Sequence, residues 1–205
     1  MEVSIISATD NPIHVISLCA GTCYGKSDYS LKRVKNCCNA NHMSVFENAT
    51  ITFKIEGISR ACSHQLVRHR LASFCQESQR YCKVDTDSRD WFVKPKAFCA
   101  GEDDPFLSME KDEFFYCCML DAGVNYKDAL KAGIKPEDAR YLLPEATKTN
   151  LTMTVNVREL FHFLDLRTDK AAQWEIRELA EEMVKQIKDF LGEEWQELIS
   201  LWETQ

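Results

Sequence analysis

The sequence predicts an α+β fold, a mixed or antiparallel sheet with flanking helices, and three observations predict it. Thr50–Ile55 alternates polar and apolar residues, which is typical of a strand with one buried face. The 205 residues contain no internal repeat and no linker, so we expect a single domain over residues 1–205. An apolar stripe at helical spacing near the C-terminal end indicates a packed helix, and it consists of Ile176, Leu179, Met183, Ile187 and Phe190.

The N-terminal part is expected to start with a strand and two helices. Val3–Ser7 has the composition of a short strand. Asn11 and Pro12 are typical of a helix start, with Asn11 as the cap and Pro12 in the first turn. A second helix is expected from Asp28 to Ala40.

The next elements surround the most polar part of the chain. We expect Gly57 to end the Thr50–Ile55 strand and Ser59 to cap a helix that runs to about Arg70. Ser73–Asp90 is predicted to be a functional loop with little regular structure. Further helices are expected over Phe106–Lys131, from Pro136, over Arg158–Leu166 and, capped by Asp169, as the final helix; short strands are expected at Trp91–Val93 and Leu151–Val155.

Charge and composition exclude several classes of protein. The net charge of −7 argues against a general nucleic-acid binder, which needs a basic face. No apolar run approaches the ~20 residues of a membrane helix, and no secretion signal is recognised. The ten cysteines, which contain no C-x-x-C pair, are therefore expected to be free thiols of a cytoplasmic protein, without a metal site.

Ala20–Ser27 fits a relaxed phosphate-binding loop, with Val15–Leu18 as the strand that would precede it. A phosphotransferase of that type needs a parallel sheet and a strand that ends in a magnesium-binding Asp. The sequence indicates neither, so we expect a chance match and keep a P-loop phosphotransferase as an alternative function.

The segment Arg68–Tyr81 carries the strongest chemical signal. It reads Arg-His-Arg, a polar stretch with Ser78, and then Arg80. Three successive residues of a helix cannot all face one core, so at least one of them must point into a cleft or an interface. Guanidinium groups suit carboxylate or phosphate recognition. A non-catalytic module that binds anionic partners through Arg68–Arg80 is a further alternative.

This segment resembles the signature of flavin-dependent thymidylate synthases, which is Arg-His-Arg, seven residues and Ser. Other blocks resemble that family in the same order, namely Asn41–Glu47, Arg140–Pro144, Asn156–Arg167 and Ala172–Ile176. The chain departs from the family at Gly21, where an Arg is typical, and at Gln76, where some members carry Glu. Glu77 could then take the place of that carboxylate.

The resemblance implies the activity and its ligands. It implies reductive methylation of dUMP to dTMP, with methylenetetrahydrofolate as the carbon donor and FAD reduced by NADPH. No enzyme nucleophile is expected, and the catalytic residues would be Arg167, Arg80 and His42. The resemblance also implies a cytoplasmic homotetramer whose active sites are shared between subunits.

The site residues implied by the resemblance form two sets. Those expected to bind dUMP are Gln65, Arg68, Gln76, Glu77, Ser78, Gln79, Arg80, Arg140 and Arg167. Those expected to bind FAD are Ser44, Glu47, Arg68, His69, Arg70, Leu71, Asn156, Arg158 and His162. Two alternatives remain open for single residues: His162 could be a core histidine, and Arg140 could cap the C-terminus of a helix.

Overall fold

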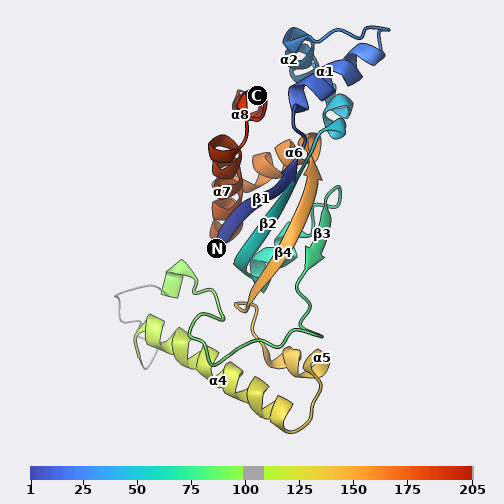
Figure 1. Cartoon of the computed structure of the whole chain (residues 1–205). Helices are drawn as coiled ribbons and strands as arrows, with labels where there is room; N and C mark the ends of the chain where they lie inside the picture. The colour runs from blue at the N-terminus through green and yellow to red at the C-terminus, as the bar shows by residue number, and fades with distance from the viewer. Residues whose placement is uncertain (99–108, 205) are drawn as a thin grey trace. The chain divides into compact units, whose positions relative to one another are not determined.

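A four-stranded sheet flanked by helices confirms the α+β class in the computed structural model, which describes residues 1–98 and 109–204 (Figure 1). β1 pairs with β2 in antiparallel register, with Val3 opposite Ile55. Ile51, Phe53 and Ile55 of β2 are buried, so the predicted alternation is confirmed. The strands lie in the order β1 (Glu2–Ala8), β2 (Thr50–Ser59), β4 (Lys148–Asn156), β3 (Ser73–Gln76).

The chain divides into two compact units. The first unit comprises Met1–Glu56, Gln65–Cys75 and Leu151–Gln205, and the second comprises Gly57–His64 and Gln76–Asn150. The expectation of a single domain over residues 1–205 stays a prediction.

Helices surround the core of the first unit. α7 (Trp174–Phe190) packs against β1, α6 (Val157–Arg167) and α8 (Glu193–Glu203). Its Ile176, Leu179, Met183 and Ile187 are fully buried, as predicted. Phe190 is 71% exposed, because it is the last residue of α7, so its predicted core position is wrong.

The N-terminal helices of this unit refine the predicted boundaries. α1 (Pro12–Thr22) has Pro in its first turn as expected, although the Asn11 side chain makes no capping hydrogen bond. α2 (Leu31–Asn39) starts later than predicted, because the Ser30 hydroxyl caps it by accepting from the Arg33 N–H.

The same region excludes the phosphate-binding loop. Val15–Leu18, the strand that such a loop needs, lies inside α1, and the helix continues over the first residues of the motif to Thr22. The P-loop alternative is therefore wrong.

The chain around the Arg-His-Arg motif differs from the prediction at both ends of a helix. Gly57 does not end β2, because its positive φ of 72° and the bond from its N–H to Asn150 Oδ1 carry the strand on to Ser59. The Ser59 hydroxyl accepts from the Cys62 N–H, which confirms the cap. The helix, α3 (Arg60–Leu66), ends before the motif instead of at Arg70. The motif therefore lies in a turn.

The second unit has its own core beneath α4 (Lys111–Lys131). Trp91, Phe115 and Met119 form one buried cluster, and Tyr126 packs with Ala129 in another. α4 ends at Lys131 as predicted, and Gly133, with φ of 85°, follows it. The expected start at Phe106 lies outside the described residues. The remaining elements are η2 (Lys96–Phe98), α5 (Pro136–Ala139) and η3 (Arg140–Leu142).

Two further predictions need correction. The predicted loop Ser73–Asp90 begins as β3, because Ser73–Gln76 pairs at the edge of the sheet. Trp91–Val93 forms only an isolated bridge, from Phe92 to Thr147, instead of a strand.

The C-terminal helices differ in cap and number. Gln173 caps α7 in place of Asp169, because its side-chain oxygen accepts from Glu175 N–H and Ile176 N–H. Asp169 accepts from the Ala171 N–H in the preceding turn. α7 is not the final helix, since α8 follows it. Within the described ranges, no helix is long and apolar enough to cross a membrane.

We predict that Leu179→Ala lowers the free energy of unfolding by about 2–5 kcal/mol, because it leaves a cavity where a fully buried side chain packs in the core. Urea denaturation followed by circular dichroism measures the change. Glu181→Ala, at an exposed position of the same helix, is the control and should shift the midpoint little. Equal effects of the two substitutions would contradict the assignment of the core.

Candidate functional site

All residues that the resemblance assigns to FAD lie in the first unit. Glu47, in the 3₁₀ helix η1 (Met43–Asn48), accepts a 2.5 Å hydrogen bond at Oε1 from Arg158 Nη1 at the start of α6. Asn156 caps α6, since its Oδ1 accepts from the Glu159 N–H at 2.9 Å. The ion pair and the cap hold the start of α6 beside η1.

A cavity of about 380 Å³ opens beside this helix end. Leu71, Arg158 and His162, three of the residues predicted for FAD, line it together with Asn41 and Phe161. Its lining combines apolar side chains with Arg158, His162 and the carboxylates of Glu159 and Asp165, which suits a ligand that has both a ring system and polar groups. His162 is exposed, so the alternative of a core histidine is wrong.

His42 lies apart from these contacts, at the N-terminal boundary of η1. It lines a second cavity of about 550 Å³ in the same unit. Lys26, Lys32 and Arg33 also line this cavity, together with Asp28, which pairs with Arg33 at 3.0 Å, so the net charge of the lining is positive and favours anionic groups. Lys26 belongs to the rejected phosphate-binding-loop pattern, whereas the sequence did not single out Lys32 and Arg33.

His69 is the most buried residue of the Arg-His-Arg motif, with 4% of its surface exposed. Its Nδ1 lies 3.3 Å from Glu159 Oε1, and its Nε2 accepts a 3.1 Å hydrogen bond from Arg167 Nε. Phe163 contacts the ring edge-to-face, with the ring centroids 4.9 Å apart. The motif is therefore anchored by its central residue.

The hydrogen bonds and the pKa of His69 agree on its charge. Burial lowers the pKa of His69, and the positive charge of Arg167 lowers it further, while Glu159 acts in the opposite direction. The neutral imidazole has one N–H, which must be at Nδ1 because Nε2 accepts from Arg167. We infer a chain of alternating acceptors and donors through Glu159, His69 and Arg167.

The same residues also form a group with metal-ligand chemistry. Ligand atoms of His69, Glu159 and His162 lie within 4.8 Å of one another. A metal ion at His69 would have to replace the proton that Nδ1 directs at Glu159, because Nε2 is already an acceptor. The sequence expectation of no metal site stays a prediction.

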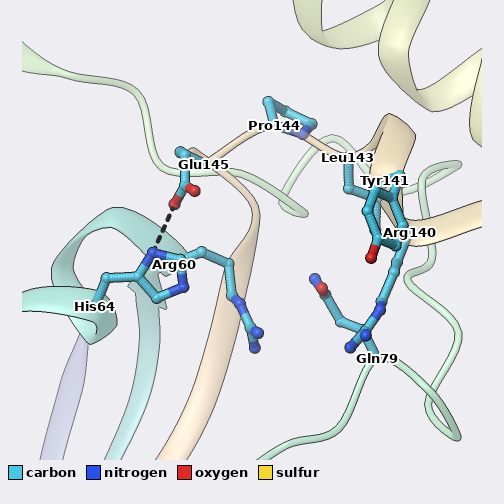
Figure 2. A pocket seen from close by; sticks show the side chains of 8 residues that line it. All are labelled: Arg60, His64, Gln79, Arg140, Tyr141, Leu143, Pro144 and Glu145. Atoms are coloured by element: carbon cyan, nitrogen blue, oxygen red, sulfur yellow. Dashed lines mark ion pairs between the residues drawn. The ribbon is translucent and has the colours of Figure 1, made fainter. Parts of the chain in front are cut away.

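In the second unit, Arg60, Gln79 and Arg140 extend toward one space (Figure 2). They line a pocket of about 210 Å³. Gln79 Nε2 is buried and has no hydrogen-bond partner among the described residues. Burial lowers the pKa of Arg60, but a guanidinium stays charged at neutral pH. Two cations and one unused amide donor favour an anion here, and the size suits a phosphate group. Glu145 also lines this space, where it pairs with His64. We call this space the anion pocket.

Neighbouring contacts hold the loop that carries Gln79. Arg80 Nε donates to Glu137 Oε2 at 3.3 Å, and Arg140 Nε donates to the Glu137 carbonyl oxygen at 3.0 Å. Glu137 therefore positions both arginines from the first turn of α5. The hydrogen bond from Arg140 Nε to the Glu137 carbonyl oxygen caps the C-terminus of α5, so the alternative role as a helix cap is confirmed. Arg140 also lines the anion pocket.

The other loop residues predicted for dUMP are held by short-range contacts of the same unit. Gln76 Nε2 donates to Ser63 Oγ at 2.9 Å, and Glu77 Oε2 accepts from Asn150 Nδ2 at 2.9 Å. The Ser78 hydroxyl accepts from the Arg80 N–H at 3.3 Å. Of the predicted dUMP set, only Gln65, Arg68 and Arg167 belong to the first unit.

Sequence reasoning missed three residues of these arrangements. Arg60 precedes the motif by one helix and carries no signature spacing. Glu137 lies in the first turn of the helix expected from Pro136, where an acidic residue is common and indicates no binding role. Glu159 lies three residues after Asn156, so a capping pattern was the one available signal.

Comparison with known proteins places this arrangement in a family. The family described as "Thymidylate synthase complementing protein" matches residues 4–191. The flavin-dependent thymidylate synthase of Pyrococcus furiosus is 37% identical over 203 residues, covering 91% of this chain and 79% of that protein. That of Geobacter sulfurreducens is 38% identical over 199 residues, covering 92% and 82%.

The structural comparison agrees. A solved flavin-dependent thymidylate synthase from Helicobacter pylori, complexed with FAD and dUMP, matches with a TM-score of 0.74 and 25% identity. The match covers 97% of each chain. The likeness therefore extends to the elements that carry both predicted ligand sets.

We predict that the free energy of unfolding falls as the pH is lowered below about 6.5. The folded state lowers the pKa of His69, so the unfolded chain takes up its proton first, and this stability is present above pH 6.5 and lost below it. Urea midpoints at pH 7.5 and 5.5 measure the effect. His69→Gln should show a smaller loss of stability between these two pH values. An identical pH dependence in wild type and variant would contradict the neutral, buried histidine.

Proposed function

The chain belongs to the family of thymidylate synthase complementing proteins, and we propose on this premise that it is a flavin-dependent thymidylate synthase. It methylates dUMP to dTMP with methylenetetrahydrofolate as the carbon donor. The observation that carries the proposal is the gathering of the predicted FAD residues at one helix end beside a cavity, in a chain 38% identical to such an enzyme over 92% of its length.

The residues around the α6 cavity fit FAD. Arg158 and His162 offer donors for phosphate oxygens, and Leu71 and Phe161 offer apolar surface for a ring. FAD, when bound, supplies the electron transfer, and NADPH is the reductant that restores it. The protein positions the cofactor and keeps the Arg158 guanidinium in place through its ion pair with Glu47.

The anion pocket of the second unit is the proposed site of the dUMP phosphate. Arg60 and Arg140 neutralise the charge of the phosphate. Gln79 Nε2, which has no partner among the described residues, donates a hydrogen bond to a phosphate oxygen. Gln76, Glu77, Ser78 and Arg80 of the same unit are proposed to complete the contacts of this pocket, and Gln65 and Arg68 are the proposed dUMP residues of the first unit.

Arg167 is proposed to act on the uracil ring. Its guanidinium stabilises the negative charge that develops on a ring oxygen when the methylene group is transferred to C5 of the uracil ring. His69 holds Arg167 at Nε, so the two Nη groups are the donors directed at substrate. His42, at the second cavity, serves the folate side of the reaction.

The reaction proceeds without an enzyme nucleophile. The Ser78 hydroxyl is held by the Arg80 N–H, a backbone donor that lowers nucleophilicity where a general base would raise it. The described cysteines are free thiols, which supports work in a reducing compartment, the cytoplasm. Cys75 lies inside the Arg68–Tyr81 segment and Cys82 directly follows it, and both are exposed free thiols.

A homotetramer with shared active sites is the proposed assembly. Four ligands, dUMP, FAD, folate and NADPH, need more binding surface than one small chain supplies easily. Exposed Arg80 and Tyr81 stack as a cation–π pair 5.5 Å apart, a rigid arrangement suited to a contact with another subunit.

We predict that the purified protein is yellow with bound FAD and forms dTMP anaerobically from dUMP, methylenetetrahydrofolate and NADPH. Absorbance near the flavin bands and chromatographic detection of dTMP are the measurements. Omission of each reactant in turn is the control. A colourless protein that FAD cannot reconstitute, or a flavoprotein that releases no tritium from C5-labelled dUMP, would contradict the proposal.

We predict that Arg80→Ala and Arg167→Ala are each nearly inactive, and that co-expression of the two restores activity. Loss of a charge-assisted hydrogen bond costs about 2–3 kcal/mol in transition-state binding. If one site takes Arg80 and Arg167 from different chains, random assortment leaves about a quarter of the sites intact. Each variant co-expressed with itself is the control. Verified mixed oligomers without recovery, or a monomer in sedimentation, would contradict shared sites.

A further inference from the structure

Glu159 is a buried carboxylate to which the proposed reaction assigns no role. It lies in the first turn of α6, and 5% of its surface is exposed. Burial of a carboxylate is unfavourable unless hydrogen bonds replace the lost water. The His69 ring, 3.3 Å away, supplies that bond. A residue with this cost is retained for packing or for a task at the site.

The Nε2 atom of His69, on the other side of the ring from Glu159, indicates what this task is. A neutral imidazole carries one proton, and the hydrogen bond at one nitrogen sets the state of the other. The carboxylate at Nδ1 can only accept, so it draws the proton to Nδ1 and leaves Nε2 with a lone pair. Arg167 can only donate, and its Nε lies 3.1 Å from that lone pair.

We propose that Glu159 is a positioning residue that holds His69 as the Nδ1–H tautomer and, through it, fixes the guanidinium of Arg167. The alternative tautomer would set an Nε2–H against the Arg167 N–H, which removes the anchor of a long, flexible side chain. The consequence for turnover rests on the proposed function, in which Arg167 acts on the uracil.

Packing restricts His69 to a single ring orientation. The Phe163 ring contacts the imidazole edge-to-face at 4.9 Å, and His162 lies edge-on with a centroid separation of 6.1 Å. A ring flip would exchange Nδ1 for a carbon in front of Glu159. The aromatic contacts oppose that flip, so the tautomer is the variable that Glu159 controls.

The first test is spectroscopic and needs no turnover. Long-range ¹H–¹⁵N spectra of the protein labelled at histidine rings and arginine Nε, at pH 7.5, report which nitrogen of His69 is protonated. We expect Nδ1–H in wild type and a slowly exchanging Arg167 Nε–H. Glu159→Ala should convert His69 to Nε2–H or to a mixture, and should speed Arg167 exchange. Glu159→Gln, whose side-chain oxygen still accepts from Nδ1–H, should restore the wild-type spectrum.

The second test is kinetic. Glu159→Ala should lower kcat/KM for dUMP by about 10-fold or more, as expected when a residue that orients a functional group is lost. Glu159→Gln should recover most of that loss, and FAD content should stay near one per chain in both. Glu197→Ala, which removes an exposed carboxylate paired with Lys35, is the matched control and should leave spectra and kinetics unchanged.

The outcomes separate the two proposals. An Nδ1–H histidine in Glu159→Ala, a wild-type His69 without a protonated nitrogen because zinc or another metal is bound, or a changed tautomer with unchanged kcat/KM would overturn the positioning role. Wild-type protein that shows the expected spectra but forms no dTMP would overturn the proposed function, while the Glu159–His69–Arg167 chain would stand on the spectra.

Discussion

Burial of His69 determines the shape of the chain around it. α3 ends at Leu66, and the turn that follows places the imidazole between Glu159 and Phe163. In this turn the backbone N–H of His69 donates to the Leu66 carbonyl oxygen. A helix continued to Arg70 would rotate three polar side chains about its axis, and one of them would face the apolar core. The turn avoids this, since it buries one neutral ring and leaves Arg68 and Arg70 exposed.

The neutrality of His69 is the second half of that constraint. Glu159 and Arg167 contact it from opposite nitrogens, so the three groups together carry no net charge. A protonated His69 would lose its acceptor nitrogen and would face Arg167 as a like charge. Burial of His69 opposes its protonation, so a neutral acceptor, His69 Nε2, orients the guanidinium of Arg167. The chemistry proposed for Arg167 therefore depends on the position of a proton on its direct hydrogen-bond partner, His69.

An acidic chain binds anions by concentrating its cations locally. The net charge is −7, yet Arg60 and Arg140 line one small pocket, and Lys26, Lys32 and Arg33 line another. Glu137 shows how acidic residues assist, because it holds Arg80 with its carboxylate and Arg140 with its carbonyl oxygen. Positive potential at a site needs placement of charge, and the average charge of the chain does not predict it.

Sequence alone determined the class of fold, the strand at Thr50–Ile55, the buried stripe of α7 and the family, because periodicity and spaced motifs are local in the chain. It also predicted that Arg68, His69, Arg80 and Arg167 would be functional residues. Tertiary structure decided the rest. Arg60 joins Arg140, and Glu159 joins His69, across 80 and 90 positions of sequence, as their numbers in the chain show. No periodicity links residues so far apart, since only the packing of strands and helices brings Arg60 and Arg140 to one pocket and Glu159 within 3.3 Å of His69.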